Sequence, residues 1–163
     1  CDQLALVEEF LKGLGFTHKE LGKFVQKHPQ ILGQDISKDL RPNVEFLEDL
    51  EVPLEHVKKL IIRHPMLILN GAEESLKDLI ACLESIGVRR NHIGPLLARR
   101  PALISSNVQK DVWPVGDYLK SIHATADDID KIITSFPRLF RYNLDQVVIL
   151  FSTYHKMLSF HSP

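Results

Sequence analysis

Residues 61–68 read Ile-Ile-Arg-His-Pro-Met-Leu-Ile, and this arrangement recurs three more times along the chain. In each copy an apolar helical pattern leads to a proline, and apolar residues follow the proline closely. The prolines are spaced 36 residues apart, with no gap needed to align them: Pro29, Pro65, Pro101 and Pro137. A fixed period of this length is the signature of a repeat protein.

Apolar residues elsewhere keep the same register. One repeat position holds leucine in every copy: Leu11, Leu47, Leu83 and Leu119. Two more are apolar throughout: Leu21, Val57, Ile93 and Ile129, and Phe24, Leu60, Leu96 and Ile132. Agreement over this many positions indicates structurally equivalent units that stack on one another.

Each unit is predicted to contain two amphipathic helices and a short third segment. In the second unit Val57, Leu60, Ile61 and His64 follow the i, i+3, i+4, i+7 pattern of one helical face. The repeated proline lacks an N–H and disfavours helix in the residue before it, so it ends the second helix. The apolar pair after it is too short for a strand and suits one turn of 3₁₀ or α-helix.

Polar residues and glycines mark the ends of these helices. Gly15 and Gly87 indicate the turn between the two helices of a unit, and Thr17 with Glu20 forms a capping-box sequence. Asp35, Asn107 and Asn143 are expected to cap the first helix of the next unit. Proline near the start of that helix indicates either its first turn or a kink, at two equivalent positions: Pro42 and Pro114.

These features predict an all-α helical-repeat solenoid of the right-handed type, forming a single domain. We expect about four helix–turn–helix–3₁₀ units, at residues 1–34, 35–70, 71–106 and 107–142, and a terminal helix at 143–159. A single unit cannot bury its apolar face alone. Because the sequence starts within a first helix and ends within a fifth one, we expect either that it is part of a longer solenoid or that the end repeats cover their own apolar faces.

Composition excludes several classes of protein. The net charge of −1 provides no overall attraction to nucleic acid or to an anionic membrane. No run of 18 apolar residues is present, so no membrane span is expected. The first ten residues are acidic and amphipathic and resemble no targeting peptide. Cys1 and Cys82 suggest no disulfide framework, which favours a reducing compartment.

The four copies of the block at 61–68, together with Leu-Arg-Pro-Asn-Val-Glu-Phe-Leu-Glu-Asp-Leu at 40–50 and then Val52, resemble the mitochondrial transcription termination factor (mTERF) family. The resemblance covers essentially the whole chain and is closest in style to the plant and algal branch. It implies two α-helices and a short 3₁₀ helix per repeat. It also implies an organelle protein, in chloroplast or mitochondrion, that binds double-stranded DNA or structured RNA and regulates transcription or RNA processing.

Basic residues recur at two positions of the second helix, four residues apart and therefore on one face. Stacking would align them as a basic stripe: Lys23, Lys27, Lys59, Arg63, Arg99 and Lys131. A more scattered basic set lies near the starts of the first helices: Lys38, Arg41, Lys77 and Lys110. Lines of Lys and Arg suit phosphate contacts, which give affinity without reading sequence. The competing interpretation is a solvated face inherited by duplication.

The remaining candidate residues point away from catalysis. Trp113 shares its repeat position with Arg41 and Lys77, which makes it a candidate for base stacking. The histidines lack metal-ligand spacing, and no phosphate-binding loop or nucleophile motif occurs, so we expect no metal, cofactor, small-molecule substrate or enzymatic activity. The acidic first helices favour a second hypothesis, a protein-binding scaffold within an organellar RNA or ribosome-assembly complex.

Overall fold

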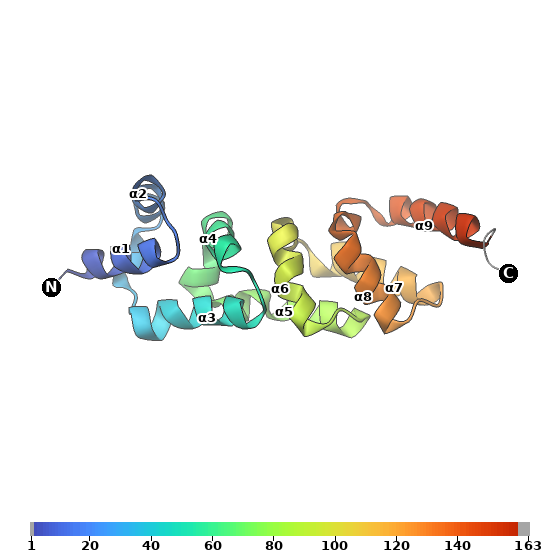
Figure 1. The fold of residues 1–163 in the computed structure, drawn as a ribbon, viewed down its shortest axis with the longest axis horizontal. Helices are drawn as coiled ribbons and strands as arrows, with labels where there is room; N and C mark the ends of the chain where they lie inside the picture. Colours follow the sequence, from blue (N-terminus) through green and yellow to red (C-terminus); the bar gives the residue numbers. More distant parts are fainter. Residues whose placement is uncertain (1, 160–163) are drawn as a thin grey trace.

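The computed structural model describes residues 2–159, with side chains from 2 to 153, as α-helices joined by short helical segments and without any strand. The first helix of each unit is α1 (Gln3–Gly13), α3 (Arg41–Asp49), α5 (Ala72–Ile86) or α7 (Trp113–Ser121). The second is α2 (His18–Lys27), α4 (Leu54–Arg63), α6 (Arg90–Arg99) or α8 (Ala126–Ser135). The units follow one another along an extended molecule whose termini lie at opposite ends (Figure 1). The predicted all-α repeat solenoid is confirmed.

We call α1, α3, α5 and α7 the first-helix row, and α2, α4, α6 and α8 the second-helix row. Within the first-helix row α5 packs against both α3 and α7, and within the second-helix row α4 packs against α6. The last helix, α9 (Leu144–Ser159), packs against α7. One apolar core runs from Val7 to Val147. The leucine position found in every unit is at most 1% exposed, and burial of each such side chain is worth about 1.5–3 kcal/mol.

The turn between the two helices of a unit has the same backbone shape in every unit. One residue per turn has a left-handed φ: Gly15 (100°), Glu51 (71°), Gly87 (123°) and His123 (68°). Glycine adopts this conformation without strain and therefore indicated two of the four turns in the sequence. The other two turns use a non-glycine residue and carried no such signal. The predicted capping box at Thr17 is present, and Thr125 with Asp128 forms another.

The repeated proline ends the second helix in every unit. A 3₁₀ segment follows in three of them, at Pro29–Gly33, Pro101–Ser105 and Pro137–Arg141. After α4 the chain instead enters a π-helical turn, Leu67–Gly71, that runs directly into α5. The short segment predicted for this unit is therefore part of the next helix.

A missing capping side chain accounts for the different link before α5. Asp35, Asn107 and Asn143 each accept a hydrogen bond from the backbone N–H three residues later, at 2.8–3.1 Å, as predicted. The equivalent residue before α5 is Gly71, which has no side chain. Asn43 of α3 replaces the cap, because its Oδ1 accepts the Ala72 N–H at 2.9 Å.

Two further π-helical turns, Ile36–Leu40 and Val108–Val112, precede α3 and α7. Pro42 and Pro114 lie immediately after them, within the first two residues of each α-helix. Because proline donates no N–H, it suits a point where the hydrogen-bonding pattern changes. Of the two predicted roles, the first-turn position is confirmed: both prolines lie in the first turn of an α-helix that continues from a π-helical turn.

Candidate nucleic-acid interface

The six residues of the basic stripe are all exposed and all lie on the second-helix row. In α2 the apolar side chains of Leu21 and Phe24 are buried, and Lys23 and Lys27 occupy the opposite, exposed face. The same arrangement places the rest of the stripe: Lys59 and Arg63 on α4, Arg99 on α6 and Lys131 on α8.

The two rows differ strongly in charge between residues 18 and 106. Second-helix segments 18–34, 54–66 and 89–106 contain ten Lys and Arg residues against two Asp and Glu. First-helix segments 35–53 and 67–88 contain three Lys and Arg against ten Asp and Glu. Over these residues a net charge near zero therefore conceals a basic side and an acidic side, and the basic side, from α2 to α6, can attract polyanions locally. The last member of the second-helix row, α8, contains three Asp and one Lys instead.

Most of the stripe is available for an external ligand. Among the described residues, no ion pair or side-chain hydrogen bond involves Lys23, Lys27, Lys59 or Arg63. Arg99 differs, because its Nη1 donates to the Thr134 carbonyl at 2.6 Å, near the end of α8. That bond holds part of the Arg99 side chain in the contact between α6 and α8. The most accessible section of the stripe therefore lies on α2 and α4.

Polar side-chain contacts between consecutive second helices hold the row together. Lys58 Nζ lies 3.1 Å from Glu20 Oε1, and two units later His92 Nδ1 lies 2.9 Å from Asp130 Oδ2. Both pairs span 38 residues and occupy equivalent positions of the repeat. Asp130 is 4% exposed and also accepts the Arg89 N–H at 3.0 Å. The sequence hypothesis missed these residues, although a carboxylate 38 residues from a lysine or a histidine, at equivalent repeat positions, was a usable signal.

Glu20 participates in both a helix cap and an interface between units. Its pKa is lowered chiefly by the hydrogen bond that it accepts from the Thr17 backbone, and next by the hydrogen bond from Lys58. Glu20 therefore stays ionised while it both caps α2 and holds α4 beside it.

The scattered basic set lies elsewhere, on the first-helix side. Lys38 and Lys110 are exposed on π-helical turns, whereas Arg41 and Lys77 line hollows between successive first helices. Three such hollows occupy equivalent places in the repeat: α1–α3 (about 720 Å³), α3–α5 (about 680 Å³) and α5–α7 (about 600 Å³). The structure thus separates this set from the basic stripe.

Trp113 lines the α5–α7 hollow and is half-buried against the core. Cys82 lies in the same hollow, and burial raises the pKa of its thiol to about 11, so the thiol stays protonated. Part of the Trp113 ring is accessible, but on the row opposite the stripe.

A family model described as mTERF matches residues 2–157. The chain belongs to the mTERF family. No curated protein matches the sequence. Family membership suggests nucleic-acid-binding regulation of organelle gene expression, the general role associated with mTERF proteins. Across the described part of the chain, no helix is long and apolar enough to cross a bilayer.

The histidines that precede two of the repeat prolines in this mTERF chain pack against other parts of the fold. His64 is buried, and burial is the main cause that lowers its pKa, opposed by the Pro101 backbone. His28 packs against Phe24, with ring centroids 5.1 Å apart. Within residues 2–153, no three His, Cys, Asp or Glu side chains gather as metal ligands would.

Proposed function

We propose that this mTERF protein binds double-stranded DNA or structured RNA through its second-helix row, and so regulates transcription or RNA processing in a chloroplast or mitochondrion. The proposal includes no catalytic step, metal or cofactor. The observation that carries it is the group of exposed, unpaired side chains on α2 and α4: Lys23, Lys27, Lys59 and Arg63.

Phosphate recognition explains why such a row would bind nucleic acid despite the net charge of −1. Each Lys or Arg that neutralises a phosphate releases condensed counterions, and this release drives association at low salt. Basic side chains on adjacent helices can follow one nucleic-acid backbone. Trp113 lies on the other row, so the proposed contact surface omits it.

The test compares charge reversals on the two rows. Lys59→Glu with Arg63→Glu is expected to weaken binding to duplex DNA or structured RNA by about tenfold or more at low salt. It is also expected to lower the slope of log affinity against log salt by about two, one for each lost phosphate contact. Fluorescence anisotropy with duplex DNA, structured RNA and single-stranded RNA across a salt series measures both quantities.

The matched control is Lys77→Glu with Lys110→Glu, which makes the same change in net charge on the first-helix side. We expect it to weaken binding much less. Equal loss in the two variants would show that the second-helix row has no special role. Absence of binding to all three nucleic acids at low salt would contradict the proposal.

A further inference from the structure

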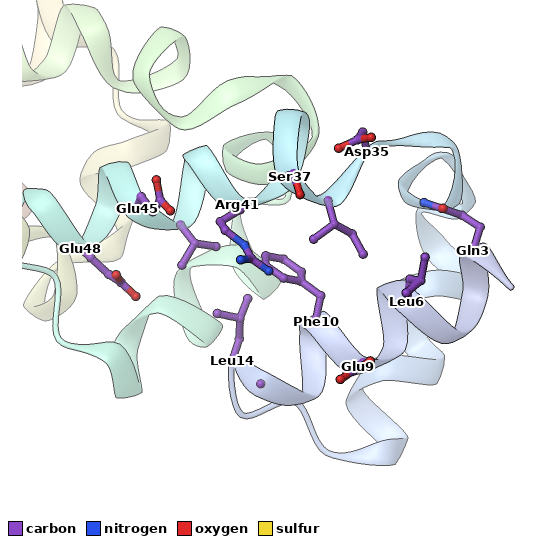
Figure 2. Close-up of a pocket in the computed structure, with 13 residues that line it drawn as sticks. Gln3, Leu6, Glu9, Phe10, Leu14, Asp35, Ser37, Arg41, Glu45 and Glu48 are labelled. Atoms are coloured by element: carbon purple, nitrogen blue, oxygen red, sulfur yellow. The ribbon is translucent and has the colours of Figure 1, made fainter. Parts of the chain in front are cut away.

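The α1–α3 hollow has an apolar floor that is only partly covered. Leu6 and Phe10 of α1 and Leu14, the residue that follows this helix, recur every four residues on one side, and Phe10 and Leu14 are half-buried. Leu6 is 48% exposed. Figure 2 shows Phe10 and Leu14 extending from α1 toward α3, with Arg41 alongside. The hollow, at about 720 Å³, falls within the usual range of ligand-binding clefts, about 300–1,000 Å³.

Carboxylates surround this floor from both helices. Glu9 lies on α1, while Glu45 and Glu48 lie on α3, and all three line the hollow (Figure 2). They are exposed, and no ion pair involves them in the part of the chain that the structure describes. Arg41 is the single cation among the lining residues. The hollow therefore has a negative rim with unused charge.

The equivalent hollow between α3 and α5 is less suited to a basic ligand. Three carboxylates line it, Glu73, Glu74 and Glu84, but Glu84 is paired with Arg90 at 3.0 Å. Lys77 occupies the repeat position that Arg41 has in the α1–α3 hollow, so Arg90 is an additional cation. A single cation, no ion pair among the described lining residues and the exposed Leu6 side chain therefore distinguish the α1–α3 hollow from that neighbour.

We propose that the α1–α3 hollow is a docking site for a basic amphipathic helix of a protein partner. Aliphatic side chains of that helix pack on Leu6, Phe10 and Leu14, and its Lys or Arg side chains pair with the glutamates of the rim. This is the helix-in-groove mode, in which apolar anchors recur about every turn. Charge complementarity selects a basic partner and repels an acidic one.

The site lies on the first-helix row, whereas the proposed nucleic-acid surface lies on the second-helix row. The chain would therefore hold a protein and a nucleic acid at the same time and bring them together. This inference does not depend on the nucleic-acid proposal, because it involves none of the stripe residues.

The probe is a synthetic amphipathic peptide of about 18 residues, long enough to form a helix, with leucines on one face and lysines on the other. We expect saturable binding to the wild-type chain at low salt, and weaker binding as salt rises. Glu9→Lys with Glu45→Lys and Glu48→Lys is expected to weaken binding by about tenfold or more. Leu6→Ser, at an exposed position, is expected to weaken it several-fold while leaving the fold intact.

The control variant makes the same charge change away from both the hollow and the basic stripe, at three exposed residues: Glu74→Lys, Asp117→Lys and Asp145→Lys. It should bind the peptide nearly as well as wild type. Absence of peptide binding, or equal loss in the two triple variants, would overturn the proposal. Circular dichroism confirms that each variant is folded. Duplex binding of the two triple variants should match, so failure here and failure of the nucleic-acid proposal are distinguishable.

Discussion

The interface between the second and third units and the interface between the third and fourth use the same repeat position in opposite ways. At the former this position is Gly94, and the backbone of Leu50 occupies the space where a side chain would lie. At the latter it is Asp130, which is buried and hydrogen-bonded to both His92 and the Arg89 N–H. The repeat register decides where neighbouring units meet, but the side chain present decides whether they meet through close packing or a polar pair.

In the first two units the same repeat position is occupied by two further residue types. Lys58 occupies it on α4 and forms the partly exposed ion pair with Glu20. Gly22 occupies it on α2, where an added Cβ would meet no atom within 4 Å. The environment of this one repeat position is therefore a close backbone contact, a buried carboxylate, a partly exposed ion pair or open space, depending on the unit. Substitutions there should change the free energy of unfolding by very different amounts.

The largest effect is expected for Gly94→Ala. The new Cβ would lie 1.9 Å from the Leu50 carbonyl oxygen and 2.6 Å from the Val52 nitrogen, so backbone must move. Overpacking of this kind costs about 3 kcal/mol. Urea denaturation measures the loss in free energy of unfolding.

Gly22→Ala is the matched control for that substitution. It lies at the same repeat position in open space, so we expect it to stabilise α2 by up to about 1 kcal/mol through helix propensity. If Gly94→Ala also stabilised the protein, the close contact at this interface would be refuted.

A smaller loss, about 2 kcal/mol, is expected for Asp130→Ala. It removes the acceptor for the Arg89 N–H and for His92, and unmet buried hydrogen bonds carry costs of this size. Asp127→Ala serves as the comparison, because Asp127 pairs with Arg89 at the exposed surface and should contribute under about 1 kcal/mol. Thermal unfolding of both variants tests the difference, and similar melting temperatures would argue against a buried role for Asp130.

The smallest effect is expected at the Lys58–Glu20 pair. Exposed and partly exposed ion pairs contribute about 0.2–1 kcal/mol, and salt screens them. A double-mutant cycle with Lys58→Met and Glu20→Gln should give a coupling energy in that range, falling as sodium chloride is raised. A coupling energy above about 2 kcal/mol would show that this interface resembles the one at Asp130.

Local sequence rules anticipated much of the molecule. The proline spacing, the capping residues Asp35, Asn107 and Asn143, and the capping box at Thr17 were all interpreted correctly. The direct run from Pro65 into α5 was missed, because it depends on Asn43 of another helix replacing the cap that Gly71 lacks. For the candidate surfaces, the sequence aligned the basic residues of the second helices, but it did not show that Arg99 is bonded to Thr134.

The sequence by itself determined the period, the helix ends and the basic stripe, because capping, proline geometry and helical periodicity act over only a few residues. The tertiary structure decided which charges pair between units, which repeat position is crowded or open, and how the apolar face of α1 and the glutamates of α3 form one hollow. Those outcomes depend on distances between helices, which are fixed only when whole units stack on one another. The same distances decide whether side chains 38 residues apart come into contact.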